Sequence, residues 1–366
     1  MGTIRPFVQD DIPQIADLYK KVFLHLDGPS SQALQSHFTN IFFHHPWCDA
    51  ELPSLVYQEN TGKIVGFLGV MPRLMTMQGQ CIRVAVSNNF MVVPESRHTL
   101  AAVQLLKTFF QGPQDLSLAE GGEPSRRIWE GLGGKKALLY SLRWTHLLRP
   151  SRYLMSKLAE NKRWAPLTLA AWPFCWMTDA VIARMSPNHF HQLQMQFEAE
   201  EADVATLRLC VYGISKNLSL RPVYDDHSLS WLLEILVQKK SFGTLRKIVL
   251  RDTTHQIVGW YLYYLNPGSV SEVLQIGANG EAMPQVLNHL FHDAWLHGAV
   301  ALSGRLESQF IQEISEQYCF FHYGNPWMLI RSNNSELLNT IHRGEAFLSR
   351  LEGEWMFYKF FDAEKA

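Results

Sequence analysis

The stretch Val84–Gln111, VAVSNNFMVVPESRHTLAAVQLLKTFFQ, contains the transition that decides the fold. Its first part, through Val93, is rich in β-branched and apolar residues and carries no charge, which predicts a buried strand. Pro94 ends this strand, because proline has no N–H to donate to a neighbouring strand. From Arg97 onward, apolar residues recur at helical spacing and predict a helix with one buried face: Leu100, Val103, Leu106, Phe109 and Phe110.

A strand that turns directly into a helix leaves backbone N–H groups unpaired at the turn. These groups and the helix dipole favour an anion such as a pyrophosphate. An ordinary crossover between a strand and a helix has the same pattern, so the stretch alone leaves both interpretations open.

The spacing of Pro94, Arg97, Ala102 and the pair Leu105–Leu106 matches a known motif. The stretch resembles motif A of the GNAT acetyltransferase superfamily, in which an Arg/Gln-x-x-Gly-x-Gly/Ala loop holds the pyrophosphate of acetyl-CoA. His98 stands where the motif has glycine, as does Leu100. Glycine would let the backbone approach the phosphates closely, so here the backbone N–H groups would have to serve without it.

The resemblance implies a set of residues that bind acetyl-CoA as co-substrate. In GNAT enzymes the central strand is splayed, and one of its free backbone N–H groups polarises the thioester carbonyl. The positions implied here are, at the strand end, Met91, Val92 and Val93, and at the helix start, Arg97, His98, Thr99, Leu100, Ala101 and Ala102.

The order of expected elements along residues 1–150 is β-α-α-β-β-β-α-β-α-β, which again resembles GNAT proteins. The segment Ser125–Gly134, SRRIWEGLGG, is similar to a late helix of that family, with Trp129 at the place of a tyrosine that often protonates the leaving thiolate. Tryptophan cannot act as that acid, because its indole N–H is a donor without usable acidity. The closing stretch Arg350–Trp355, RLEGEW, resembles the end of bacterial GNAT-type proteins.

An internal repeat indicates duplication. Glu59–Phe67, ENTGKIVGF, is echoed by Asp252–Trp260, DTTHQIVGW, and Arg5-Pro6 is echoed by Arg221-Pro222. We therefore expect an α/β (α+β) fold with mixed sheets, built as two tandem GNAT-like acyltransferase domains with a helical connector. The expected boundaries are 1–150 for the first domain, 151–203 for the connector and 204–366 for the second, degenerate domain. The first domain is expected to end with a long strand at Ala137–Leu148, and the last strand of the second is expected near Trp327–Ile330. The first domain is the better candidate for the cofactor site.

Composition limits the functional class. The 366 residues suffice for two domains, and the formal net charge of −1 gives no electrostatic argument for DNA. Five scattered cysteines without a Cys-x-x-Cys pair favour neither disulfides nor a zinc ribbon, and the histidine pairs lack partners at metal-ligand spacing. We expect no metal, a cytoplasmic protein, no signal peptide and no apolar run of the ~20 residues that a membrane-spanning helix needs.

Residues 126–163 carry ten lysines or arginines against two glutamates, and the uncharged, tryptophan-rich run Trp164–Thr178 follows. A basic run beside such a stretch is typical of a membrane-surface segment, so peripheral membrane contact through 126–186 is one expectation. The alternative is a connector whose tryptophans pack between two domains.

Two polar residues are the candidates for catalysis. Glu120 follows the predicted strand Asp115–Ala119 at its carboxyl end, where α/β sheets place ligands, and could serve as a base or merely cap the next helix. Asn89, like Asn88, interrupts an apolar strand and could hold a substrate or a water, or pin a bulge.

The function expected from these features is an acyl-CoA-dependent N-acyltransferase that moves acetyl from acetyl-CoA to an amine of a small molecule or glycan. One alternative is a peptidyltransferase-like enzyme that takes its acyl group from aminoacyl-tRNA. The other is a catalytically inactive GNAT-fold scaffold for binding, which would agree with Trp129 and the missing glycines.

Overall fold

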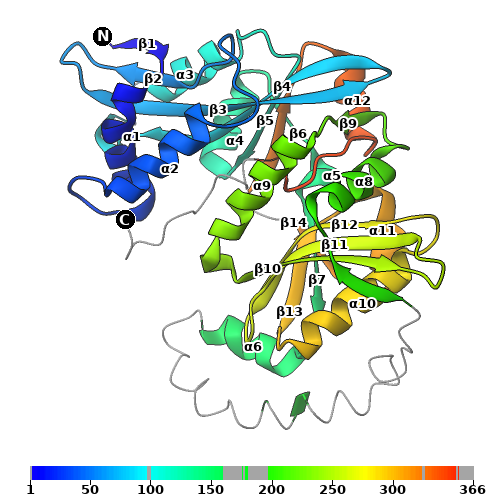
Figure 1. Cartoon of the computed structure of the whole chain (residues 1–366). Helices are drawn as coiled ribbons and strands as arrows, with labels where there is room; N and C mark the ends of the chain where they lie inside the picture. Colours follow the sequence, from blue (N-terminus) through cyan, green and yellow to red (C-terminus); the bar gives the residue numbers. More distant parts are fainter. Residues whose placement is uncertain are drawn as a thin grey trace. The chain divides into compact units, whose positions relative to one another are not determined.

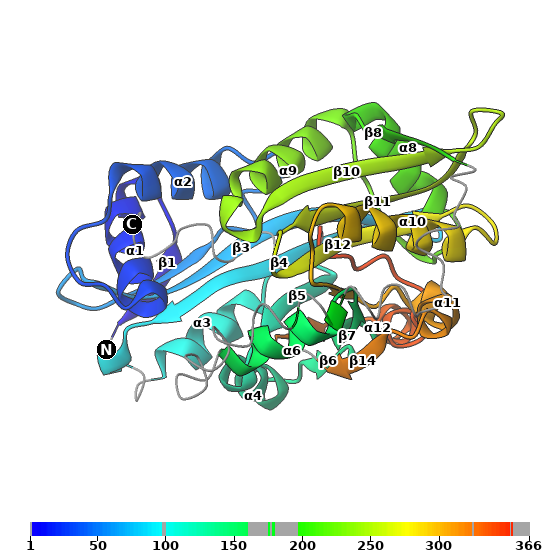
Figure 2. The same ribbon diagram turned by 90° about the horizontal axis from the view of Figure 1, so that it is seen from below.

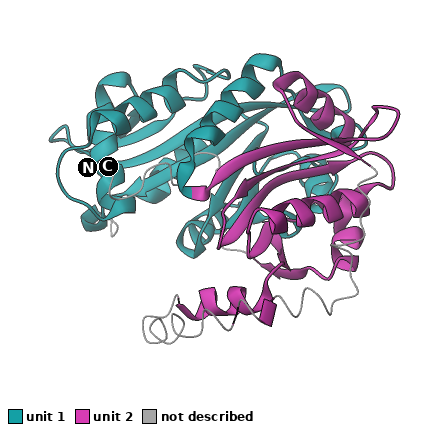
Figure 3. Ribbon diagram, turned by 60° about the horizontal axis from the view of Figure 1, so that its bottom comes forward, with its two compact units in different colours: residues 1–141, 215–241, 324–366 teal, residues 142–214, 242–323 magenta. Residues whose placement is uncertain are grey.

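The strand predicted at Val84–Val93 forms the second half of β4 (Gln80–Val92), at the centre of a mixed sheet. The computed structural model describes residues 2–96, 100–159, 175, 178–179, 197–323, 326–351 and 353. These fall into two compact units (Figures 1 and 3). Unit 1 takes residues 1–141, 215–241 and 324–366, and unit 2 takes 142–214 and 242–323.

Within its described residues, unit 1 is built on one sheet in which only β4 and β5 run parallel. A two-residue turn at Gln78 and Gly79, with positive φ angles of 52° and 80°, joins β3 to β4. This turn fixes the register of the long β3–β4 hairpin. In spatial order, the strands are β1 (Thr3–Pro6), β2 (Leu55–Gln58), β3 (Ile64–Met77), β4, β5 (Leu116–Gly121), β15 (Trp327–Arg331) and β6 (Lys135–Lys136), with β9 (Leu220–Pro222) paired to the end of β3.

Helices cover both faces of this sheet. Figure 2 shows α2 and α9 on one side of β3 and β4, and α3 and α4 on the other. The core on the α2 side is aromatic, since Phe7, Phe42 and Phe67 pack with ring centroids 5.1 to 5.8 Å apart. The helices are α1 (Ile12–Tyr19), α2 (Gln32–Phe43), α3 (Ala101–Phe109), α4 (Glu123–Gly131), α5 (Leu138–Ser141), α9 (Asp226–Gln238) and α12 (Ser335–His342).

Unit 2 repeats the plan with a second mixed sheet whose parallel pair is β12 and β13. Its helix α10 (Met283–Leu296) packs on β11 and β12. In spatial order, the strands are β14 (Phe320–Tyr323), β7 (Leu142–Leu147), β13 (Ala301–Arg305), β12 (Val270–Ala278), β11 (Ile257–Leu265), β10 (Thr244–Arg251) and β8 (Glu198–Glu201). The other helices are α6 (Pro150–Ala159), α8 (Val204–Ser215) and α11 (Ile311–Glu316).

The predicted fold class is confirmed, because both sheets are mixed and both carry helices. The repeated segments also fall at matching places: one turn joins β2 to β3, and the other joins β10 to β11. The domain boundaries at 150 and 204 stay a prediction, since the compact units divide the chain elsewhere.

Two strand assignments were wrong. The segment 327–330, expected to close the second copy, is β15 and pairs with β5 in unit 1. The long strand expected at 137–148 is broken by α5, after which β7 pairs with β13 in unit 2. Ser141 fixes this break, because its hydroxyl donates to Ala137 O at 2.9 Å and accepts from Met328 N at 3.0 Å.

Most of the predicted connector, including the tryptophan-rich run apart from Cys175 and Thr178, lies outside the described residues. The described part includes the helix α6 and helical positions at Cys175 and at Thr178 and Asp179. Among the helices that the structure describes, none combines the length and the apolar character that a membrane crossing requires.

Candidate active site

The parallel ladder between β4 and β5 ends early. Val84–Val86 pair with Leu116–Leu118, but β4 continues to Val92 and β5 to Gly121. Beyond Val86, β4 stays paired with β3 while β5 pairs with β15, so the two parallel strands separate toward their carboxyl ends. This is the splayed arrangement that the resemblance implied.

The register shows which backbone donor faces the separation. Val93 N–H donates to Val65 O at 2.9 Å, and Met91 lies opposite Phe67 on β3. Alternate residues of a strand direct their N–H groups to opposite neighbours, so Val92 directs its N–H toward the β5 side, past the end of the ladder. Of the three predicted backbone positions, Val92 is the one whose N–H faces the separation between the two strands.

Asn89 sits in a β-bulge. Phe67 pairs with Met91 but Gly69 pairs with Asn88, so β4 has one extra residue there. Asn89 has a φ of 48°, a left-handed conformation that asparagine tolerates better than most residues. Its Nδ2 donates to Asn88 Oδ1 at 3.1 Å. The interpretation of these asparagines as the residues of a bulge is therefore confirmed, and it does not exclude a contact with a ligand.

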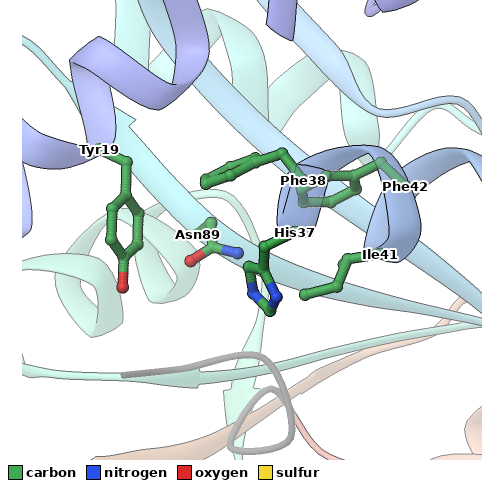
Figure 4. Close-up of a pocket in the computed structure, with 6 residues that line it drawn as sticks. All are labelled: Tyr19, His37, Phe38, Ile41, Phe42 and Asn89. Carbon is green, nitrogen blue, oxygen red and sulfur yellow. The ribbon is translucent and has the colours of Figure 1, made fainter. Parts of the chain in front are cut away.

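The side chain of Asn89 lines a narrow pocket between β4 and the first two helices (Figure 4). Asn89 is 4 % exposed, and its Oδ1 is buried without a hydrogen-bond partner in the described part of the chain. The pocket is a tight crevice: the space between its atoms totals about 190 Å³ with the adjoining solvent included, and it has no room for a water molecule inside. Its other walls are mainly aromatic and come from Tyr19, His37, Phe38, Ile41 and Phe42.

Glu120 lies on β5 opposite Met328 of β15 and is 7 % exposed. Its predicted alternative role as a helix cap is not observed, because α4 begins after Gly122 without a side-chain cap. Instead, a segment near the C-terminus packs against the carboxylate: a Cβ at Gly353 would collide with Glu120 Oε1. A side chain at this point of the RLEGEW stretch would therefore displace the end of the Glu120 side chain.

Lys239, at the end of α9, is fully buried and lies within electrostatic range of Glu120. Burial holds the pKa of this amine well below its usual range, and the nearby Glu120 carboxylate only partly offsets the effect. His37 lies within electrostatic range of the same amine, and burial together with Lys239 lowers the pKa of its imidazole to about 3. The imidazole is thus neutral at physiological pH.

The predicted phosphate-binding end of the site is described only in part. Arg97, His98 and Thr99 lie outside the described residues. Leu100 is 64 % exposed, so its side chain extends into solvent rather than filling the space at the start of α3. Ala101 is fully buried, Ala102 is partly exposed, and α3 begins without a side-chain cap.

Trp129 is a core residue. Its ring is 1 % exposed and packs edge-on against Phe110, with centroids 4.8 Å apart. The side chain that replaces the tyrosine therefore takes a packing role. Among the residues that the structure describes, no group of three histidines, cysteines or acids is placed to hold a metal ion.

Sequence reasoning missed Lys239, His37 and Gly353. His37 could have been found, because it lies in the apolar stripe of α2 that contains Leu34, Phe38 and Ile41. Lys239 gives no such signal: with Lys240 it has the appearance of an ordinary pair of surface lysines.

Known proteins resemble this chain in structure, although none was matched by sequence. No protein-family model matches the chain, and no curated protein matches it in sequence. Solved structures do match. One is a conserved protein of unknown function from Enterococcus faecalis V583, described as a probable N-acyltransferase, at 9 % identity and a TM-score of 0.57, covering 91 % of this chain and 73 % of that one.

A GCN5-related N-acetyltransferase from Anabaena variabilis matches at 12 % identity with a TM-score of 0.57, covering 90 % of this chain and 72 % of that one. Saccharomyces cerevisiae N-myristoyltransferase, solved with bound myristoyl-CoA and inhibitors, matches at 10 % identity with a TM-score of 0.52, covering 90 % and 80 %. These matches span both sheets. The chain therefore has the GNAT fold, in an arrangement consistent with two tandem GNAT-like domains.

Proposed function

We propose that this protein is an acyl-CoA-dependent N-acyltransferase that transfers acetyl from acetyl-CoA to an amine of a small molecule or glycan. The observation that carries the proposal is the early end of the β4–β5 ladder, with the Val92 N–H directed past it and Glu120 further along β5. The fold shared with N-acetyltransferases and with a myristoyl-CoA-binding enzyme supports the acyl-CoA donor.

The site offers what acyl transfer to an amine needs. A backbone N–H that points at the developing oxyanion stabilises the tetrahedral intermediate. Among the residues that the structure describes, Asn89 Oδ1 is a buried acceptor without a donor, so it fits an N–H group of a bound molecule. Glu120 is the predicted base for the proton that the amine must lose.

The phosphate end of acetyl-CoA would bind at the start of α3. Support comes from the exposed Leu100, which leaves that end accessible, and from the absence of a side-chain cap on the helix. In this proposal, the predicted residues Arg97 to Ala102 contact the pyrophosphate, mainly through backbone N–H groups.

Contact with a membrane surface through 126–186 remains a proposal, as does a cytoplasmic location without DNA binding. The described part of the basic run is largely paired: Arg126 contacts Glu123 and Glu130, and Arg152 contacts Asp179. Pelleting with anionic liposomes at low salt would support the contact. Pelleting that persists after removal of residues 150–186 would argue against it.

Isothermal titration with acetyl-CoA tests the donor. We expect micromolar binding that Arg97→Glu abolishes and that Arg343→Glu, the same charge change at an exposed position of unit 1, leaves unchanged. Thiol release from acetyl-CoA in the presence of a panel of amines then tests transfer. No binding, together with a salt-sensitive gel shift by tRNA, would favour the aminoacyl-tRNA alternative, and silence in both assays would favour the scaffold.

A further inference from the structure

We propose that Arg73 is a positioning residue for the acyl transfer. It holds the end of the segment 346–351, so that Gly353 packs on the Glu120 carboxylate and fixes the direction in which this carboxylate points. The inference rests on the proposed acyl transfer, with Glu120 as its base, and adds a residue that acts through Glu120 without touching the substrate. All the groups that carry the argument belong to unit 1.

Arg73 lies on the same face of the sheet as Glu120. Arg73 pairs with Val84 on β4, and Val84 pairs with Leu116 on β5, so these three residues form one row across the sheet. Glu120 lies four residues further along β5, and alternate residues of a strand share a face. Two strand spacings of ~4.8 Å and four residue rises of ~3.3 Å separate the Cα atoms of Arg73 and Glu120 by roughly 16 Å. A segment that packs on this face can therefore link the two side chains.

The segment 346–351, which follows α12, runs buried through unit 1. Each of its residues is at most 4 % exposed. Phe347 N–H donates to Leu220 O at 2.9 Å. The Tyr140 hydroxyl donates to Ala346 O at 2.7 Å and accepts from Ala346 N–H at 3.0 Å. Because buried backbone outside helices and strands needs such partners, these hydrogen bonds fix the path of the segment as it approaches Glu120.

Arg73 contacts the far end of this segment. Its Nη2 donates to Leu351 O at 3.3 Å, two residues before Gly353. The guanidinium also lies over the ring of Trp47, 3.8 Å from the ring centroid, and that ring packs edge-on against Trp231 of α9 with centroids 5.9 Å apart. A guanidinium over an aromatic face is held by electrostatic attraction to the ring. The Leu351 carbonyl is therefore held by a side chain that is itself fixed to β3 and to the aromatic core.

Gly353 transmits this position to the carboxylate. Its backbone lies so close to Glu120 that a Cβ there would meet Oε1. Two residues span at most ~7 Å, so the hydrogen bond at Leu351 limits where Gly353 can lie. Without that bond the end of the segment would be free to shift, and the carboxylate would lose the contact that selects its orientation. A base has to lie within hydrogen-bond reach of the proton that it takes, and a misplacement of ~1 Å costs up to ~100-fold in rate.

The test is a double-mutant cycle on thiol release from acetyl-CoA with an accepted amine, made in the full chain with Arg73→Met and Glu120→Gln. Methionine keeps an unbranched stem beside Trp47 but has no N–H to donate to Leu351 O. We expect Arg73→Met to lower kcat ~10–100-fold, while KM for acetyl-CoA stays within about twofold of wild type.

The Glu120→Gln background separates positioning from a general structural role. There, Arg73→Met should lower kcat by less than about twofold, because the carboxylate that Arg73 positions is already absent. The cycle is run at about pH 9, where more of the amine is free without a base and the residual rate of Glu120→Gln can be measured. Arg73→Lys keeps a cation beside Trp47 and a donor, so it should recover part of the loss.

Tyr140→Phe is the matched control. It removes the hydroxyl that holds the same segment at Ala346, seven residues before Gly353. We expect this variant to unfold at a lower urea concentration than wild type while its kcat stays within about threefold. A loss of kcat in Tyr140→Phe as large as that in Arg73→Met would assign the effect to the stability of the segment and contradict the positioning role.

The remaining outcomes also decide the matter. Equal losses from Arg73→Met with and without Glu120→Gln would overturn the proposal, because Arg73 would then act by another route. Should Arg73→Met not fold, Gly353→Ala takes its place in the cycle: its loss of rate has to disappear in the Glu120→Gln background, or the proposal fails. Wild-type protein that binds acetyl-CoA but releases no thiol with any amine would reject acyl transfer itself, and the positioning role with it.

Discussion

Asn89 allows the backbone and the side chain of the bulge to be tested separately, by comparing Asn89→Gly with Asn89→Ala. Glycine adopts a φ of 48° freely, whereas alanine at such an angle costs ~1–2 kcal/mol. Glycine also has greater conformational freedom in the unfolded chain, which destabilises the glycine variant by ~0.5–1 kcal/mol relative to alanine. We therefore expect the glycine variant to be more stable than the alanine variant by about 1 kcal/mol.

Compared with wild type, Asn89→Gly gains and loses similar amounts of folding free energy. It loses the hydrogen bond from Nδ2 to Asn88 Oδ1, worth about 1 kcal/mol. It also removes Oδ1, which is buried without a partner and costs about 1–3 kcal/mol. Stability should thus change little or rise, as measured by urea unfolding. That result would show that the fold does not need the Asn89 amide for its stability, which favours a role for this amide in ligand binding.

That role is tested by binding. Both variants should lose at least ~10-fold in acetyl-CoA affinity or in thiol release, since each lacks the acceptor that a bound N–H would use. If Asn89→Gly is as active as wild type, the amide does not contact substrate. If Asn89→Gly is also several kcal/mol less stable than wild type, the Asn89 side chain has a structural role.

Three other predictions concern the backbone donor at Val92, the closing stretch and a buried acid of unit 2. Val92→Pro removes the proposed oxyanion donor, so it should lower the rate of thiol release ~100–1,000-fold while acetyl-CoA binding is retained. Val93→Pro removes the hydrogen bond from Val93 N–H to Val65 O on β3, so this variant should unfold at a lower urea concentration. Gly353→Ala should lower both stability and rate, because the added methyl displaces the Glu120 carboxylate; an unchanged urea midpoint would show that the closing stretch can move aside. In unit 2, burial raises the pKa of Glu307 from 4.5 to about 7. The free energy of unfolding of the wild type should therefore fall by at most about 3 kcal/mol as the pH rises from 4.5 to 7, and then stay level. Glu307→Gln should show no such fall in urea titrations.

The features of the site that sequence predicted are local ones. The β4 strand, its end at Pro94 and the helix with Leu105 and Leu106 buried all follow from spacing within one short stretch. The splay was expected only through resemblance, and no side chain encodes it. The part of β5 that separates from β4 is paired on its other edge with β15, a strand that lies about 200 residues further along the chain, so the splay depends on contacts that no local pattern contains.

The exchange of β7 and β15 between units could not be predicted for the same reason. An apolar run such as Trp327–Arg331 predicts a strand, but any exposed sheet edge satisfies its backbone equally well. The burial of Lys239 is likewise a tertiary effect. Nothing in its sequence neighbourhood distinguishes it from Lys240, which is exposed.

The two units show how one backbone plan acquires different chemistry. In unit 2 the parallel pair also ends early, at Val273 and Gly304, and β12 has an extra residue just before Gln275. Gln275 is 1 % exposed and its Oε1 lacks a hydrogen-bond partner in the described residues, much as Asn89 does in unit 1.

What differs is the set of side chains that surrounds each separation. Glu120 in unit 1 faces a buried lysine from a segment outside the first copy, whereas Glu307 in unit 2 faces Gln275 and Arg305. Both units have a splay and a bulge, so the segments around them distinguish their chemistry. An N-terminal segment cut at residue 150 would keep the Val92 donor and Glu120 but lose Gly353, which packs on the Glu120 carboxylate, so we expect it to release thiol from acetyl-CoA more slowly than the full chain.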